Sequence, residues 1–307
     1  HRYPDPSGTA LKEALSAHTG VAAEGIVLGN GSHELLMLLA QCFAGPKTAV
    51  AYSQYGFAVF AIAAAAVGAE TICVPALGPM HTSAPYGHDL PALAAAVTDS
   101  TRLLYLANPN NPTGTWFEQA ALEECLQRVP RSCLVVLDEA YHEYAESGVA
   151  APAAALLAQY PNLVITRTFS KAYALAGLRV GYALAHPSVV AVLERMRESF
   201  NVNSLGLAAA EAALMDQDHL QGVRRFTHAE REWLHEQLAA RGFRALPSQT
   251  NFLLIEAGPD AAVLEQQLFA RGVIVRPMAG YRLGHMLRIS VGAREENQRL
   301  LEALPHD

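Results

Sequence analysis

Hydrophobic residues in the first 185 positions follow two alternating patterns. Short apolar runs predict strands, and longer stretches with apolar residues at helical spacing predict helices between most of them. The predicted strands are residues 25–29, 47–52, 70–75, 102–107, 132–138, 162–169 and 180–185. The predicted helices are residues 32–43, 55–68 and 117–129. Several strands are continuously apolar, which is typical of strands buried on both faces, so we expect an α/β fold with a mostly parallel sheet covered by helices.

The pattern changes near residue 187, where longer helices with polar faces begin. Helices are predicted at 187–200, 222–242 and 294–304, and strands at 250–257, 272–277 and 285–292. A few strands grouped with helices indicate a second, smaller α+β domain. We expect a large domain over residues 18–200 and a small domain formed by residues 1–17 and 201–307. Residues 76–92, dense in Pro and Gly, are predicted to be a loop.

Composition narrows the class of protein. A chain of 307 residues with 51% hydrophobic and 17% charged residues can bury a large core, and its length favours two domains. The net charge is −7 and the 22 Lys and Arg residues are scattered, which argues against nucleic-acid binding. The apolar stretch at 58–69 is too short to span a membrane.

The spacing of the cysteines and the first residues of the chain indicate the cellular compartment. Cys42, Cys73, Cys125 and Cys133 show no C-x-x-C spacing, so we expect the reduced thiols of a cytoplasmic protein and no disulfides. We also expect no metal site. The chain starts at "HRYPDP" without a methionine or a signal-peptide pattern. We therefore expect this start to be a boundary with further residues upstream.

Four polar stretches follow predicted strands, and ligands of open α/β sheets bind at the carboxyl ends of strands. The first is "GNGSHELL", where Gly29 and Gly31 surround a turn into a helix. Glu34 stands where a Rossmann fingerprint has its third glycine. Two interpretations stay open: a phosphate seat at the helix N-terminus, or a tight turn capped by Ser32.

The second and third stretches are "NPNNPTG" and "LVVLDEAY". The prolines of the second favour a rigid loop that presents Asn108, Asn110 and Asn111. The third ends an apolar strand with Asp138 and Glu139. A Walker B role for this acid fails because the sequence has no G-x-x-x-x-G-K-[ST]. A structural cap, or a carboxylate that faces a cationic ring nitrogen, remains open.

The fourth stretch is "TRTFSKAYALAGLRVGY", in which Lys171 follows a strand and precedes small residues. Burial and nearby cations would lower the pKa of this lysine below about 10.4 and make its amine a nucleophile for a carbonyl carbon. An isolated lysine in such a context is often a surface residue. Thr168, Ser170 and Arg179, together with the glycine turn, favour a cup for a phosphate dianion nearby.

Four motifs, "RYPDP", "NPNNPTG", "DEAY" and "TFSKAYALAGLRVGY", occur in this order along nearly the whole chain. They resemble the motif series of fold-type I aminotransferases that use pyridoxal 5'-phosphate, most closely the histidinol-phosphate aminotransferase group. The resemblance implies a three-layer large domain of the PLP-transferase type and a smaller α+β domain. It also implies pyridoxal phosphate as the cofactor.

The resemblance assigns roles to residues around the cofactor ring. Lys171 would bind the cofactor covalently and move a proton at the substrate α-carbon. Asp138 would pair with the pyridinium nitrogen. Asn111 and Tyr141 would donate hydrogen bonds to the phenolic oxygen, and Tyr55 would stack on the ring.

Further roles concern the phosphate, the partner and the substrate. The implied phosphate ligands are Gly31, Ser32, His33, Thr168, Ser170, Arg179 and, from a partner subunit, Tyr3, so a homodimer is implied. Arg288 would bind the substrate α-carboxylate in a bidentate fork beside Asn111, and Arg276 would contact a phosphate end of the substrate. His33 departs from the acidic residue usual in this group, and the N-terminal arm with its "N-E-N-P-x-G" segment is absent from the sequence.

The expected activity is transfer of an amino group between histidinol phosphate and 2-oxoglutarate. An aromatic amino acid aminotransferase is one alternative, and a decarboxylase of the threonine-phosphate type is another, because it shares these motifs. A regulator domain without enzymatic activity is the least favoured, since it would need a basic winged-helix segment upstream.

Overall fold

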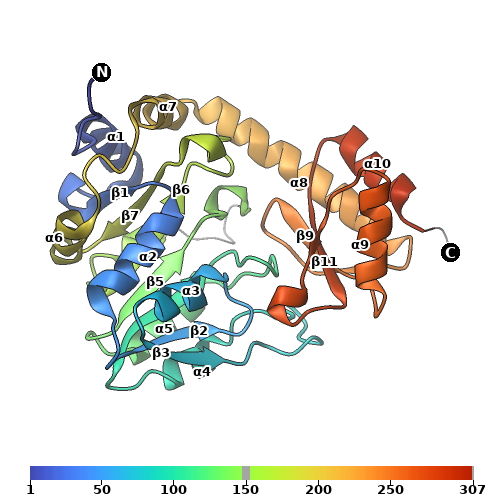
Figure 1. Ribbon diagram of the computed structural model, residues 1–307, viewed down its shortest axis with the longest axis horizontal. Helices are drawn as coiled ribbons and strands as arrows, with labels where there is room; N and C mark the ends of the chain where they lie inside the picture. The colour runs from blue at the N-terminus through green and yellow to red at the C-terminus, as the bar shows by residue number, and fades with distance from the viewer. Residues whose placement is uncertain (147–152, 306–307) are drawn as a thin grey trace.

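The computed structural model describes residues 1–146 and 153–305, and its strands form two separate sheets (Figure 1). The larger sheet has the strand order β1-β7-β6-β5-β4-β2-β3. Its strands are β1 Ile26–Gly29, β2 Ala49–Ser53, β3 Glu70–Val74, β4 Thr101–Ala107, β5 Leu134–Asp138, β6 Leu163–Thr168 and β7 Gly181–Ala185. All neighbours pair in parallel except that β7 is antiparallel to both β6 and β1. The predicted mostly parallel sheet is thus confirmed.

Helices cover both faces of this sheet, so the large part of the molecule has three layers. Alternate residues of β4 enter different cores: Leu103 and Tyr105 pack on one face, Leu104 and Leu106 on the other. This explains why the strand is apolar at successive positions. One face is covered by α2 Ser32–Phe43, α3 Val59–Ala66 and α6 Pro187–Met196, and the other by α1 Thr9–Thr19, α4 Leu90–Ala95, α5 Gln119–Arg128 and α7 Ser204–Met215.

The smaller sheet is antiparallel, with the order β10-β11-β9-β8. Its strands are β8 Arg244–Ala245, β9 Phe252–Glu256, β10 Arg276–Pro277 and β11 Met286–Ser290. Helices α8 Gln217–Ala239, α9 Ala261–Ala270 and α10 Arg294–Ala303 share its core. In Figure 1, α8 runs from the end of α7 beside the large sheet to the small sheet. The smaller α+β part predicted from the sequence is therefore present.

The exact division into domains stays a prediction. Leu11 and Leu15 of α1 and Ala210 and Leu214 of α7 belong to the core against the large sheet. These residues lie in the segments that the sequence assigns to the small domain. Among the described residues, no helix combines the length and the apolar character that crossing a membrane requires.

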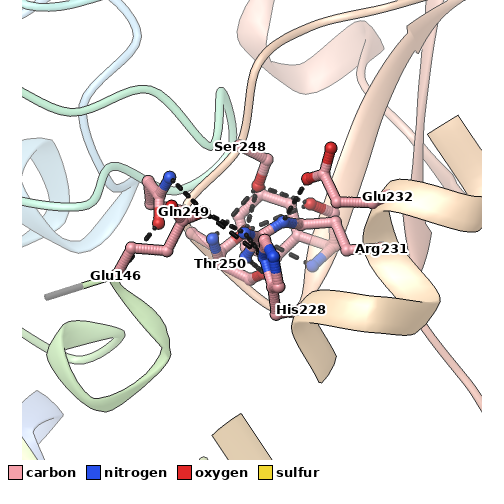
Figure 2. Close-up of polar contacts among 8 residues, drawn as sticks. Glu146, His228, Arg231, Glu232, Ser248, Gln249 and Thr250 are labelled. Atoms are coloured by element: carbon pink, nitrogen blue, oxygen red, sulfur yellow. Dashed lines mark hydrogen bonds and ion pairs between the residues drawn. The ribbon is translucent and has the colours of Figure 1, made fainter. Parts of the chain in front are cut away.

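A polar cluster connects the two parts (Figure 2). Arg231 of α8 is 1% exposed, and its Nη1 donates to the carbonyl of Thr250 at 3.1 Å. Its Nη2 lies 3.4 Å from Oε1 of Glu146, which belongs to the segment after β5. Gln249 completes the connection, because it accepts from the backbone N–H of Glu146 at 3.0 Å and donates to the Glu146 carboxylate at 3.2 Å. The cluster holds α8 against the large sheet's loops.

Candidate active site

A cavity of about 330 Å³ opens at the carboxyl ends of β4, β5 and β6, between the large sheet and the small one. Its walls come from segments far apart in the sequence. They are Ser32, His33, Phe57, Ala58, Ala107, Pro109, Asn111, Asp138, Ala140, Tyr141, Thr168, Ser170, Lys171, Arg179, Arg276, Tyr281 and Arg288. Most of the predicted site residues therefore lie around one cavity, at the strand ends where polar residues were expected to converge.

Asp138 and Lys171 both line this cavity. Asp138 ends β5, is 4% exposed and accepts a hydrogen bond from Thr166 Oγ1 at 3.0 Å. Burial raises the pKa of Asp138 to about 6, against the opposing effects of the Thr166 bond and the Lys171 charge. Burial lowers the pKa of Lys171, and the positive charge of Arg288 lowers it further, while Asp138 raises it. The site thus holds an amine that loses its proton more easily than a surface lysine does.

Three side chains, those of Thr168, Ser170 and Arg179, build a cup for an anion beside Lys171. Arg179 Nη1 donates to Ser170 Oγ at 3.3 Å, and Thr168 Oγ1 lies 3.0 Å from the same oxygen. Arg179 adopts φ 56°, a left-handed conformation that is strained for a residue with a Cβ. Strain of this kind persists where the surrounding structure fixes a side chain in a functional position.

The glycine turn before α2 closes the other side of the cup. Gly31 has φ 79°, and a Cβ there would lie 2.4 Å from Arg179 Nη2. A Cβ on Gly181 would likewise lie 2.4 Å from the backbone nitrogen of Ser32. The backbone therefore packs directly on the guanidinium and on the neighbouring strand. Because no side chain caps α2, the N–H groups of its first turn are available to an anion.

The rim of the cavity carries two arginines from the small sheet. Arg276 of β10 and Arg288 of β11 are paired residues in adjacent antiparallel strands. Arg288 lies 4.8 Å from the centroid of the Phe252 ring, and its Nη1 donates to Oδ1 of Asn111. Burial lowers the pKa of Arg288, Tyr141 opposes this effect, and the adjacent Arg276 adds to it. Two positive charges thus face the same cavity from one rigid sheet.

Three asparagines follow β4, and two of their side chains hold the loop while the third lines the cavity. Asn108 exchanges hydrogen bonds with the backbone of Phe117 at 3.0 and 3.1 Å. Asn110 donates to the carbonyl of Tyr55 at 2.9 Å. Asn111 alone of the three lines the cavity. Beside it, Tyr141 lies with its ring centroid 5.2 Å from Lys171 Nζ, and burial raises the pKa of its hydroxyl to about 12, so that it stays a proton donor.

Three predicted residues, Gly31, Tyr55 and Tyr3, are not among those that line the cavity. Tyr55 is half-buried and packs edge-on against Tyr86, with ring centroids 5.5 Å apart. The stacking role predicted for Tyr55 stays untested. Tyr3 is 80% exposed and stacks on Phe200 at 4.7 Å. It lies outside the cavity of its own chain.

Two aromatic residues that line the cavity, Tyr281 and Phe57, were not predicted from the sequence. Tyr281 lies in the turn between β10 and β11, and its hydroxyl accepts a hydrogen bond from the backbone N–H of Ala58 at 3.1 Å. Phe57 lies two positions after Tyr55, beyond the bend at Gly56. The glycines around Tyr281, in "AGYRLG", predict a turn between the strands that carry Arg276 and Arg288, but not that its tyrosine faces the cavity.

Comparison with known proteins gives consistent results. The family described as aminotransferase class I and II matches residues 1–304. Histidinol-phosphate aminotransferase 2 of Pseudomonas fluorescens is 49% identical over 99% of this chain and 80% of its own length. Histidinol-phosphate aminotransferase 1 of Idiomarina loihiensis is 46% identical over 99% of this chain and 81% of its own length.

A solved structure agrees with these sequences. The histidinol-phosphate aminotransferase of Sinorhizobium meliloti, solved in complex with pyridoxal-5'-phosphate, superimposes with a TM-score of 0.91 at 34% identity. The match covers 99% of this chain and 82% of that one.

Proposed function

The chain belongs to the aminotransferase class I and II family, and from this premise we propose that it is a histidinol-phosphate aminotransferase dependent on pyridoxal phosphate. Its substrates would be histidinol phosphate, or the corresponding oxo compound, and the pair glutamate and 2-oxoglutarate. The observation that carries the proposal is the convergence of Lys171, Asp138 and the Arg179 cup with two arginines in one cavity.

The residues present fit pyridoxal phosphate. The cofactor carries a phosphate, a basic ring nitrogen and an aldehyde, and the cavity has a matching group for each. The phosphate fits the N–H groups of Ser32 and His33 and the side chains of Thr168, Ser170 and Arg179, because glycine at 31 lets the backbone meet the guanidinium. When bound, the cofactor supplies a ring that withdraws electrons from the substrate α-carbon.

Lys171 and Asp138 would act as the proton-handling pair. Lys171, with its pKa lowered by burial and by Arg288, can accept the proton from the substrate α-carbon and return one at C4′ of the cofactor. Asp138 is buried and needs a positive partner to stay ionised, which a protonated ring nitrogen provides. Asn111 and Tyr141 would donate to the phenolic oxygen of the ring.

The small sheet would orient the substrate. Arg288 offers a planar fork for the α-carboxylate of glutamate, and Asn111 holds that fork in place. Arg276 would bind the phosphate end of histidinol phosphate. The shared cavity wall and the pairing of these two residues support both roles.

The proposal extends to assembly and location. A homodimer is supported by the exposed Tyr3, whose hydroxyl would reach the phosphate cup of the partner subunit. A cytoplasmic location is supported by the free thiols at Cys42, Cys73, Cys125 and Cys133, all within the described residues. The domain division at residues 18–200 belongs to the same proposal.

A panel of amines tests the activity. The protein loaded with pyridoxal phosphate is mixed with 2-oxoglutarate and either histidinol phosphate, phenylalanine or threonine phosphate, and glutamate and carbon dioxide are measured. We expect glutamate from histidinol phosphate with the highest kcat/KM. Faster turnover of phenylalanine would identify an aromatic aminotransferase instead, and carbon dioxide from threonine phosphate would identify a decarboxylase.

A further inference from the structure

A second group of side chains holds the glycine turn at residues 29–31 from outside the cavity. Asn201, in the segment between α6 and α7, donates from Nδ2 to the carbonyl of Leu28 at 3.1 Å and to Glu34 Oε2 at 2.8 Å. The same oxygen of Glu34 accepts the backbone N–H of Asn30, the middle residue of the turn. Neither Asn201 nor Glu34 lines the cavity.

The orientation of the Asn201 amide is fixed by its other neighbour. Asn201 Oδ1 accepts from Arg197 Nη1 at 3.1 Å, and a guanidinium can only donate. Arg197 is itself held, because its Nε pairs with Glu194 at 2.6 Å and its Nη2 donates to the carbonyl of Pro6. Asn201 therefore donates its two N–H groups to Leu28 and Glu34, and exchange of its amide oxygen and nitrogen would break these hydrogen bonds.

Gly31 N donates to the carbonyl of Gly29 at 2.8 Å within the turn, and Asn201 and Glu34 add the side-chain hydrogen bonds that hold it from outside. β1 is an edge strand, so its outward carbonyls have no strand partner, and Asn201 supplies the donor for Leu28. The clearance at Gly31 is small, since even a methyl group would come within 2.4 Å of Arg179 Nη2. A shift of the turn would move the N–H groups of Ser32 and His33 away from the cup.

We propose that Asn201 is a positioning residue for the phosphate of the cofactor. It acts through Leu28 and Glu34 and does not touch the cofactor itself. The proposal rests on the proposed function. It predicts different effects on ligands with and without a phosphate, which a purely structural role of Asn201 would not. Loss of Asn201 should weaken ligands that carry the phosphate and leave ligands without it unaffected.

Two ligands make this distinction measurable. Dissociation constants of pyridoxal phosphate and of pyridoxal, which lacks the phosphate, are measured by absorbance for the apoprotein and its variants. For Asn201→Ala we expect pyridoxal phosphate to bind about tenfold more weakly and pyridoxal to bind within about twofold of wild type. Equal weakening of both ligands, or of neither, would overturn the proposal. A wild-type apoprotein that binds neither ligand would overturn the proposed function as well.

A matched control separates positioning from general loss of stability. Asn297 is a buried asparagine of the small sheet's core that accepts from Gly292 N at 3.0 Å and donates to Glu230 at 3.0 Å. Asn297→Ala should lower thermal stability without changing the ratio of the two dissociation constants. A changed ratio in this control would contradict the assignment to Asn201.

A pair of charge variants tests whether Asn201 acts through its hydrogen bond to Glu34. These variants also serve if Asn201→Ala does not fold. Asn201→Asp places a carboxylate against Glu34 and should weaken pyridoxal phosphate most. Adding Glu34→Gln removes the repulsion between the two carboxylates, although one amide cannot serve both Asn30 N and position 201 as Glu34 Oε2 does, and the carbonyl of Leu28 still lacks its donor. We expect the double variant to recover part of the affinity lost in Asn201→Asp, and additive losses would overturn the route through Glu34.

Discussion

Arg288 of the small sheet donates a hydrogen bond from Nη1 to Oδ1 of Asn111, which belongs to the loop after β4 of the large sheet. This contact crosses the cavity between the two sheets and holds the guanidinium beside Lys171, whose pKa it lowers. Under the proposed function, binding of the substrate carboxylate and the lowered pKa of the amine would therefore depend on one side chain.

Arg288→Lys should separate substrate binding from cofactor binding. Lysine keeps a positive charge but cannot form two parallel hydrogen bonds to a carboxylate, so we expect KM for glutamate to rise about 10- to 100-fold. The dissociation constant of pyridoxal phosphate should change little. Arg244→Lys, in the same sheet and paired with Glu256, is the matched control. An unchanged KM in Arg288→Lys would exclude the carboxylate role.

Lys171→Ala should abolish the covalent link to the cofactor. We expect kcat to fall by at least about 10²- to 10⁴-fold, because the residue that moves the proton is lost. Borohydride reduction followed by peptide mass spectrometry should find the cofactor on a peptide containing Lys171 in wild type. The exposed Lys47 serves as the control, since Lys47→Ala should retain both the label and the turnover. A label on any other residue would refute the assignment.

Asp138→Asn should change how the stability of the apoprotein depends on pH. Burial raises the pKa of Asp138 from an ordinary 3.8 to about 6, so the folded protein binds the proton more tightly than the unfolded one. The neutral acid's contribution is complete below pH 3.8 and is lost as pH rises through about 6. This difference corresponds to up to about 3 kcal/mol.

The asparagine variant avoids this loss, so its free energy of unfolding should exceed that of wild type at pH 8 and match it near pH 3.5. Urea denaturation of both apoproteins across this range measures the difference. Turnover of the variant should nevertheless fall, because an amide cannot keep the ring nitrogen protonated. Parallel pH curves for the two proteins would contradict the raised pKa.

Arg231→Met should destabilise the junction between the two sheets. The change removes the donor to the Thr250 carbonyl and leaves that buried group without its partner, at a cost of about 1–3 kcal/mol. Glu146→Gln should cost less than about 1 kcal/mol, since its carboxylate is half-exposed. Urea denaturation compares the two variants. Equal effects would mean that the ion pair, and not the bond to Thr250, stabilises the junction.

Tyr3→Phe tests the contact between subunits. If its hydroxyl reaches the partner's phosphate cup, the loss of one hydrogen bond to a charged group should weaken pyridoxal phosphate about tenfold. The mass measured by light scattering should remain that of a dimer. Tyr52→Phe is the control. A monomeric wild type would refute the homodimer, and unchanged affinity would refute the role of the hydroxyl.

The sequence predicted the large sheet well because its strands are buried on both faces and are continuously apolar. Helix α2 was predicted with its bounds, Ser32–Phe43, because its apolar residues repeat regularly between a glycine turn and the following loop. The predicted helix at 55–68 is shorter in the structure, since the bond from Gly56 N to the Ser53 carbonyl bends the chain before α3 begins at Val59.

Other elements escaped detection for physical reasons. Helix α7 is rich in alanine and lacks a polar face, and α9 exposes Val263 and Phe269, so neither shows the amphipathic pattern on which prediction depends. Strands β8 and β10 have only two residues each. The loop prediction at 76–92 holds until Asp89, which caps α4 by accepting from Ala92 N.

Within the candidate site, charged residues at strand ends were predictable, whereas aromatic walls were not. Lys171 and Asp138 follow apolar strands, and the sheet brings such positions to one edge. Tyr55 and Phe57 lie on either side of the bend at Gly56, and no sequence pattern reveals which of the two rings faces the cavity. Tyr281 depended on how the small sheet docks on the large one, which sequence alone does not specify.

The pairing of Arg276 with Arg288 has a consequence for selectivity. Backbone hydrogen bonds between adjacent strands fix the separation of the two guanidinium stems, so the small sheet acts as a ruler. If the two arginines bind the two ends of the substrate as proposed, a compound with anionic ends at that spacing would relieve the repulsion between them, and a compound with one such end would relieve only part of it. Discrimination by length would then follow from a strand register.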